Sequence, residues 1–264
     1  MRKIVVHYMP LIFLVSLSAL TLNFLIWAYN PLNPAAEVKE YLQSSNYVEV
    51  IQEKNVYFIP RNVKKNNFEN VGIIFYPGGH VDYTAYAPFA YRLVEKGITT
   101  VILNVPLSFA IFDVDSAKTI INDTKFSDKE WFLAGHSLGG VVASEFLVKH
   151  PELVGTRVKG IIFIASYPAK DISHLPIKSL CIYGSEDGVL PPEKIREKKA
   201  FFPSSTEYVE ILGGNHSQFG SYGLQKGDKE AEITAYEQIS IVVKAIEEFL
   251  ERYKSEKENL TRVK

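Results

Sequence analysis

The chain has 264 residues, of which 47% are hydrophobic and 22% are charged, and this composition predicts one folded domain with a sizeable core. Its 29 basic and 30 acidic residues nearly cancel, and no long run of like charge occurs, so nucleic-acid binding is excluded as an expected function. Cys181 is the only cysteine, which excludes an intramolecular disulfide, and the apolar residues around it predict a small buried side chain.

A strongly apolar segment lies near the N-terminus. No Asp, Glu, Lys or Arg occurs between Lys3 and Glu37, and residues 9–29 are long enough to cross a bilayer, which takes about 20 apolar residues in a helix. A cleaved signal peptide and a buried core helix are the alternatives. The apolar part of a signal peptide spans only about 7–15 residues, and no good cleavage site follows here, so the sequence favours an uncleaved membrane anchor.

The flanks of this segment predict its orientation. Trp27 and Tyr29 at its far end are typical of the aromatic belt at a membrane interface, and the basic pair before it favours a cytoplasmic N-terminus. We therefore expect a single-pass protein of the cell membrane whose larger part is extracytoplasmic. Two prolines predict a short stiff spacer after the helix, which divides the chain into an anchor with its spacer, residues 1–36, and one domain, residues 37–264.

From residue 47 onward, β-type apolar runs alternate with helical patterns. The predicted strands are residues 47–52, 56–60, 71–76, 99–105, 130–135, 158–165, 177–184 and 206–212. The predicted helices between and after them are residues 84–97, 115–123, 138–150, 191–202 and 229–253. Several strands are continuous apolar runs, as expected of strands covered on both faces. The alternation predicts an α/β fold with a mostly parallel sheet and helices on both faces.

Ser137 lies where a predicted buried strand meets a predicted helix, within the sequence GHSLGG. A G-x-S-x-G pattern at such a junction is typical of a nucleophile elbow, a sharp turn that tolerates only small neighbours. Gly135 and Gly139 supply these neighbours. Because the pattern also occurs by chance, the prediction depends on an acid and a histidine farther along the chain.

Both residues follow, in the order Ser, Asp, His. Asp187 comes after the predicted strand 177–184, and His216 comes after the predicted strand 206–212. Sites of open α/β sheets gather beyond the carboxyl ends of the strands, so these loops are expected to meet there. Glu186 is the alternative acid, and a solvated acidic turn is the alternative to a catalytic one.

These residue types predict acyl transfer through a serine nucleophile. His216 is expected to take the proton of Ser137 and return it to the leaving group, while Asp187 orients the imidazole. We find no H-E-x-x-H sequence or comparable cluster of ligands, so the sequence predicts no metal and no other cofactor.

An oxyanion hole requires two hydrogen-bond donors. The backbone N–H of Leu138, directly after the serine, is the first predicted donor. The loop after the strand 71–76 supplies the second. Gly79 is the predicted residue there, with His80 or Val81 as alternatives.

With these residues in place, the chain resembles the α/β-hydrolase superfamily, and within it the small dienelactone-hydrolase-like serine hydrolases. The resemblance extends over about residues 47–252 and is carried by YPGGHV, NVPLSFAIF, GHSLGG, GSEDG and GGNHSQFGSYG. It implies an α/β-hydrolase fold in which Ser137, Asp187 and His216 form the triad and the PGG loop supplies the oxyanion hole. Dienelactone hydrolases proper have a cysteine nucleophile, so their substrate is not carried over. Many lipases and esterases have a histidine before the glycines, where this chain has Pro77.

The connections between strands predict an open site. Only residues 166–176 separate two of the predicted strands, which is an ordinary connection, so no sizeable cap domain is expected. Side chains of the neighbouring loops are then predicted to wall an apolar substrate pocket, with core packing as the alternative for the aromatic ones. These residues are His80, Phe109, Ile111, Phe112, Tyr167, Phe219 and Tyr222.

We therefore expect a membrane-anchored, extracytoplasmic serine hydrolase that cleaves a carboxylic ester or related small-molecule acyl bond through an acyl-enzyme. A peptidase or amidase with the same triad is the alternative among enzymes. A catalytically idle, tethered binding module is the alternative outside them. The sequence carries no signal of oligomeric state.

Overall fold

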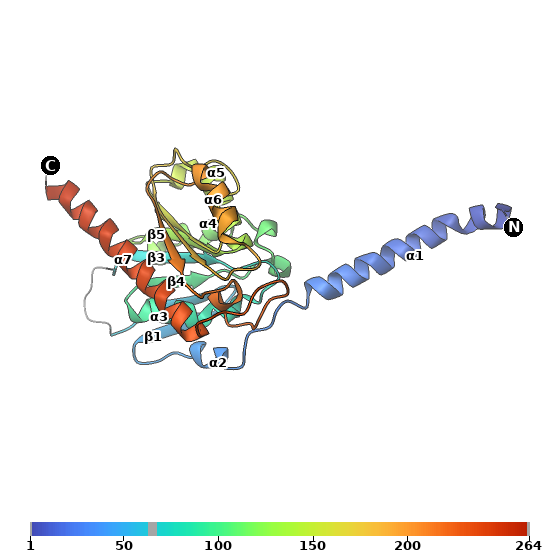
Figure 1. The fold of residues 1–264 in the computed structure, drawn as a ribbon, viewed down its shortest axis with the longest axis horizontal. Helices are drawn as coiled ribbons and strands as arrows, with labels where there is room; N and C mark the ends of the chain where they lie inside the picture. Colours follow the sequence, from blue (N-terminus) through green and yellow to red (C-terminus); the bar gives the residue numbers. More distant parts are fainter. Residues whose placement is uncertain (1, 63–67, 263–264) are drawn as a thin grey trace.

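The computed structural model describes residues 2–62 and 68–262, with side chains for residues 8–62 and 68–260. Residues 1, 63–67 and 263–264 of the predicted anchor and domain lie outside the described residues. A long N-terminal helix is attached to a folded domain built around one eight-stranded sheet (Figure 1). The strands are β1 (Val48–Gln52), β2 (Val56–Pro60), β3 (Val71–Tyr76), β4 (Thr99–Ile102), β5 (Glu130–His136), β6 (Val158–Ile164), β7 (Lys178–Gly184) and β8 (Thr206–Ile211).

The helices connect and flank these strands. The α-helices are α1 (Arg2–Ala28), α2 (Val38–Tyr41), α3 (Ala87–Glu95), α4 (Ser116–Ile121), α5 (Leu138–Lys149), α6 (Pro192–Glu197) and α7 (Ala235–Arg262). The short 3-10 helices are η1 (Tyr83–Tyr86), η2 (Pro106–Ser108), η3 (Ala110–Phe112), η4 (Thr124–Phe126), η5 (Pro151–Leu153), η6 (Lys199–Phe201) and η7 (Ser217–Phe219).

The sheet has the strand order β1-β2-β4-β3-β5-β6-β7-β8. β2 runs antiparallel to both β1 and β4, whereas each neighbouring pair from β4 to β8 is parallel. The predicted mostly parallel sheet is confirmed, and each predicted strand corresponds to an observed one. Every residue of β3 is buried, because helices cover both faces of the sheet and leave no side of this apolar run in water.

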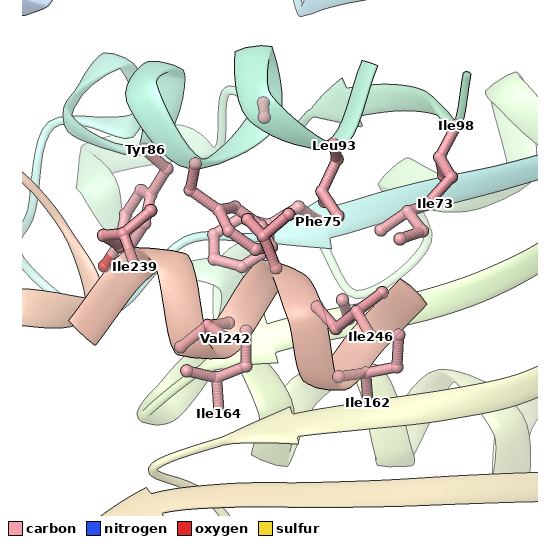
Figure 2. Close-up of a cluster of buried hydrophobic side chains, with 14 of the residues drawn as sticks. Ile73, Phe75, Tyr86, Leu93, Ile98, Ile162, Ile164, Ile239, Val242 and Ile246 are labelled. Atoms are coloured by element: carbon pink, nitrogen blue, oxygen red, sulfur yellow. The ribbon is translucent and has the colours of Figure 1, made fainter. Parts of the chain in front are cut away.

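Two apolar clusters hold the helices on the sheet. Residues of α3 and α7 pack on one face, and residues of α4, α5 and α6 pack on the other. Figure 2 shows Ile239, Val242 and Ile246 of α7 among strand residues such as Ile162 and Ile164. The central strands are therefore packed between two apolar layers of helices. This packing holds in place the carboxyl edge of the sheet, where the candidate site lies.

The last helix differs from its predicted bounds of residues 229–253. It begins at Ala235, because Thr234 and Glu237 form a capping box: the Thr234 N–H donates to Glu237 Oε2 at 2.8 Å, and the Glu237 N–H donates to Thr234 Oγ1 at 3.2 Å. The helix continues to Arg262. The preceding residues instead belong to a loop that packs against the segment around His216.

The connection between β6 and β7 is short. Residues 165–177 contain no helix and no strand, and the predicted absence of a sizeable cap is confirmed for the described chain. The carboxyl edge of the sheet is therefore not covered by an inserted domain.

Helix α1 projects away from the domain (Figure 1). Its segment Tyr8–Ala28 has a mean hydropathy of 2.1, and only 6% of its most apolar window is buried. The core-helix interpretation is therefore wrong. The helix is long and apolar enough to cross a membrane, a property that it shares with signal sequences. The side chains of the basic pair that predicts its orientation lie outside the described residues.

Candidate active site

Ser137 lies at the turn between β5 and α5. Its backbone has φ 52° and ψ −123°, a conformation that costs a residue with a side chain about 1–3 kcal/mol. A Cβ on Gly135 would come within 2.3 Å of the Gly139 backbone carbon, and one on Gly139 would come within 2.1 Å of the Tyr76 carbonyl oxygen. Only glycine fits at both positions, which is the steric reason for the pattern around the serine.

Other strained residues gather around Ser137. Of the six described non-glycine residues with positive φ, five belong to this region, and they are His80, Leu107, Ser108, Ser137 and Ala165. The Ser166 hydroxyl supports the turn by donating to the Ser137 carbonyl oxygen at 2.6 Å. Backbone strain of this kind persists where the surrounding structure holds it and is frequent at functional sites.

Asp187 and His216 form a fully buried pair. Asp187 Oδ2 accepts a hydrogen bond from His216 Nδ1 at 2.7 Å, and neither side chain is accessible to solvent. Asp187 Oδ1 accepts from the N–H groups of Val189 and Leu190 at 2.9 and 2.6 Å. The carboxylate is thereby fixed from both sides, and it fixes the imidazole in the tautomer that leaves Nε2 without a proton.

The alternative acid, Glu186, has a different environment. Its Oε2 lies 3.3 Å from Lys229 Nζ, and both of these side chains are partly exposed to solvent. Glu186 therefore takes part in a surface ion pair, and Asp187 alone of the two contacts the imidazole of His216.

The imidazole of His216 lies beside that of His136, the residue that precedes Ser137 in the sequence. The ring centroids of His136 and His216 are 4.5 Å apart. Nε2 of His216 is buried and has no hydrogen-bond partner among the described residues. The structure thus brings Asp187 and His216 together next to the elbow, without a hydrogen bond between His216 and Ser137.

The two predicted oxyanion donors come from adjacent segments. A Cβ on Gly79 would come within 2.9 Å of Leu138 Cδ2 and 3.3 Å of Phe109 Cε1. Leu138 is the first residue of α5, so its N–H has no acceptor within the helix. The N–H of the alternative donor His80 is already donated to the Ser108 carbonyl oxygen at 2.8 Å, and Val81 pairs with the segment before α2.

A cavity of about 240 Å³ lies beside Ser137. Most of its wall is apolar, and it is lined by Ser137, Leu138, Val141, Ala165, Ser166, Tyr167, Val189 and Leu190. Of the side chains predicted to bind substrate, Tyr167 is in this lining. The cavity is below the range of about 300–1,000 Å³ that is usual for ligand sites, so it accommodates only one portion of a larger ligand.

The other predicted pocket residues lie elsewhere. The ring of Phe109 lies against Gly79, and the ring of His80 stacks on Trp27 of the N-terminal helix. Phe219 and Tyr222 are buried in the apolar layer behind the site. Ile111 and Phe112 are about half exposed, at 51% and 54%. Sequence gives the loop to which each residue belongs but not the direction of its side chain, which explains these differences.

A buried network behind the elbow was not predicted. The Tyr86 hydroxyl accepts a hydrogen bond from the Gly78 N–H at 3.0 Å and lies 2.8 Å from His136 Nδ1. Burial, with a smaller contribution from the neighbouring His216, holds the pKa of His136 well below its ordinary value. His136 is therefore neutral near pH 7, and its Nδ1 accepts the Tyr86 proton. Nothing in the sequence relates Tyr86 to His136, because they are far apart in the chain.

The sequence also did not predict a role for Asp228 at the site. Its Oδ2 accepts from the N–H and hydroxyl of Ser217 at 2.7 and 2.6 Å, and its Oδ1 accepts from the Gly188 N–H at 2.9 Å. Ser217 follows His216, and Gly188 follows Asp187. One carboxylate thus joins the two loops that carry the buried pair. In the sequence, the acid stands in a polar segment that resembles an ordinary surface turn.

The comparisons with known proteins agree with this architecture. A model of the alpha/beta hydrolase family matches residues 72–240. No curated protein sequence matches the chain significantly. Among solved structures, an esterase from Pyrobaculum calidifontis is similar with 17% identity and a TM-score of 0.55, over 81% of this chain and 89% of that one.

Two further solved structures are similar. A serine hydrolase without a lid from Xanthomonas campestris has 14% identity and a TM-score of 0.53, over 80% of this chain and 96% of that one. A dienelactone hydrolase from Anabaena variabilis has 16% identity and a TM-score of 0.52, over 79% and 97% of the two chains. At these identities the structures establish the fold alone. The family match extends over more than half of the sequence, and the chain therefore belongs to the alpha/beta hydrolase family.

Proposed function

We propose that the chain is a membrane-anchored serine hydrolase that cleaves a carboxylic ester through an acyl-enzyme. The observation that carries the proposal is the buried Asp187–His216 pair beside the strained turn of Ser137. Burying a carboxylate and an imidazole is energetically costly. When the two are paired beside a serine, the imidazole can accept the proton of the hydroxyl and so activate the serine as a nucleophile.

In the first half of the reaction, Ser137 Oγ attacks the ester carbonyl carbon and its proton passes to His216 Nε2. Asp187, bonded to Nδ1, stabilises the imidazolium that forms. Collapse of the tetrahedral intermediate breaks the ester C–O bond, and His216 returns the proton to the leaving alcohol. Hydrogen bonds between a nucleophile and its base are often long before substrate binds, so the unpartnered Nε2 of His216 is compatible with this role.

In the second half, water attacks the acyl-enzyme. His216 takes a proton from the water, the bond between Ser137 Oγ and the acyl carbon breaks, and the carboxylic acid leaves while the serine regains its proton. The N–H groups of Gly79 and Leu138 stabilise the oxyanion of both tetrahedral intermediates. Removing one such donor typically lowers the rate about 10²–10³-fold.

An ester is the preferred substrate class over an amide. The similar structure from Pyrobaculum calidifontis is named an esterase, and the site has no inserted domain that would enclose a peptide. The wall of the cavity beside Ser137 offers mostly apolar contacts, which suit an acyl chain or an apolar alcohol. Metal independence is part of the proposal, and activity that survives EDTA is its direct check.

The N-terminal helix is proposed to be a retained anchor, with the domain outside the cytoplasm. A helix removed as a signal sequence has no reason to pack on the mature domain, whereas Trp27 in the last turn of α1 stacks on His80 and the adjacent Ala28 is buried. Protease added to intact cells is expected to digest the domain. Digestion only after lysis would overturn this orientation.

Hydrolysis of p-nitrophenyl butyrate by the detergent-solubilised full chain tests the catalytic proposal. Ser137→Ala is expected to lower kcat by at least about 10³-fold, because only binding and the oxyanion donors then act. Ser204→Ala is the matched control, since Ser204 is an exposed serine near the start of β8, at the opposite edge of the sheet. A folded wild-type chain without activity on any ester would instead favour the idle binding module.

A further inference from the structure

The last turn of α1 packs into the loop that follows β3. The indole of Trp27 stacks on the imidazole of His80 with 4.1 Å between ring centroids, and His80 Nε2 donates to the Trp27 carbonyl oxygen at 2.8 Å. The indole also lies 5.6 Å from the ring of Phe109. Because His80 directly follows Gly79, the end of the membrane helix is joined to the proposed oxyanion loop.

The segment after the helix is fixed along the same edge of the domain. Leu32 N–H donates to the His80 carbonyl oxygen at 2.9 Å, and the Leu32 carbonyl oxygen accepts from the Asp82 N–H at 3.0 Å. Farther along, Ala35 N–H donates to the Ser221 carbonyl oxygen at 2.7 Å. The predicted spacer is therefore attached to two loops around the candidate site and does not act as a free tether.

Apolar side chains are exposed on this same side of the domain. Ile111 and Phe112 are consecutive and about half exposed, and the ring of Phe112 lies 6.2 Å from that of Phe109, which in turn contacts Trp27. Figure 1 shows α1 leaving the domain on the side opposite the C-terminal end of α7. An exposed apolar patch that continues a membrane helix, with aromatic residues at the junction, is typical of contact with a bilayer interface.

The same contacts continue to the cavity. Trp27 packs on Phe109, Phe109 lies over Gly79, Gly79 lies against Leu138, and Leu138 lines the cavity beside Ser137. The proposed nucleophile is therefore separated from the membrane helix by only a few side chains. The cavity is small, so a larger ligand must extend beyond it.

We propose that the enzyme takes its substrate from the bilayer that holds α1, and that this substrate is an amphiphilic acyl ester embedded in the membrane. The inference rests on the proposed serine hydrolase function and the retained anchor. Ile111 and Phe112 insert into the interface beside Trp27, so the ester group of a bilayer lipid reaches Ser137 without leaving the headgroup region. Hydrolysis then yields a fatty acid and an alcohol, with water as the only co-reactant.

Activity in nanodiscs of palmitoyl-oleoyl phosphatidylcholine tests this inference with the full chain. Two probes are compared: 4-methylumbelliferyl oleate dissolved in the bilayer and water-soluble 4-methylumbelliferyl butyrate. Wild type is expected to hydrolyse both. The double variant Ile111→Asp, Phe112→Asp is expected to lower the ratio of oleate to butyrate turnover at least tenfold. The two introduced charges keep residues 111 and 112 out of the bilayer interface. Leu260→Asp is the control with unchanged ratio, since Leu260 is 70% exposed near the far end of α7.

Each result has a separate meaning. Turnover of butyrate without turnover of bilayer oleate would overturn the membrane-substrate inference and leave the hydrolase function intact. An equal loss of both activities in the double variant, with an unchanged melting temperature, would also overturn it. Absence of hydrolysis of both probes by folded wild type would instead contradict the serine hydrolase function itself.

Discussion

At Ser137, an unfavourable backbone conformation is held by its neighbours rather than by the serine itself. Gly135 and Gly139 leave room for the turn, and Ser166 holds the serine's carbonyl group. The packing of β5 and α5 on either side of the turn offsets the energetic cost of this backbone conformation. A side chain at either glycine would collide with backbone atoms, which cannot move aside as a flexible side chain does.

The acid of the proposed triad gives the sharpest residue-scale prediction. Asp187→Ala is expected to lower kcat on a soluble ester by about 10³–10⁴-fold, because His216 then loses the partner that sets its tautomer and stabilises its charge. Glu186→Ala is the matched control and should stay within about twofold of wild type, since an exposed ion pair contributes little. The reverse order of the two effects in steady-state kinetics would assign the acid to Glu186.

Much of the candidate site could be predicted at the residue scale. Ser137 directly follows β5, whereas Asp187 and His216 lie in the loops after β7 and β8, and loops in that position meet at one edge of a parallel sheet. Side-chain direction could not be predicted: Phe219 points into the apolar layer, whereas Tyr167 lines the cavity. Tyr86 was missed because its contact with His136 exists only after the sheet has formed.

At the scale of elements, the loops after β7 and β8 work as one unit. They come from different crossovers, yet Asp228 accepts hydrogen bonds from both, through Gly188 and Ser217. This carboxylate lies farther along the connection between β8 and α7, just before the predicted helix 229–253. The capping box at Thr234 starts α7 at Ala235 rather than at residue 229, so the residues after Asp228 also remain in this loop.

Replacing this carboxylate tests the coupling of the loops. Asp228→Asn turns one acceptor into a donor that faces an N–H group, so kcat is expected to fall about tenfold, comparable to the loss of one hydrogen bond to a charged group. KM should change less than about twofold, because Asp228 is not in the lining of the cavity. Asp123→Asn serves as control, since that carboxylate caps η4 away from the site. A shift in KM with unchanged kcat would contradict the positioning role.

The succession of elements was well predicted, because buried parallel strands produce apolar runs that amphipathic helices do not. The eight strands and the covering helices follow from this pattern. Helix ends were less predictable: α7 starts where a local capping interaction, not hydrophobic periodicity, stops the chain from continuing the helix toward its N-terminus.

At the scale of the whole molecule, the apolar N-terminal helix and the hydrolase domain are packed together through Trp27 and His80. Composition predicts the helix, yet it cannot predict that Trp27 stacks on His80, because that contact joins segments with different periodicities. This contact places the proposed oxyanion loop beside the proposed membrane helix, and it is the basis for proposing a substrate in the bilayer.

All of these inferences depend on Ser137 as the nucleophile. The most direct measurement is reaction of the solubilised full chain with a fluorophosphonate probe, followed by peptide mass spectrometry to locate the modified residue. The probe is expected to form one covalent adduct, on Ser137, in wild type and in Ser204→Ala, and none in Ser137→Ala or His216→Ala. An adduct on another residue, or no adduct on folded wild-type protein, would contradict the proposed function.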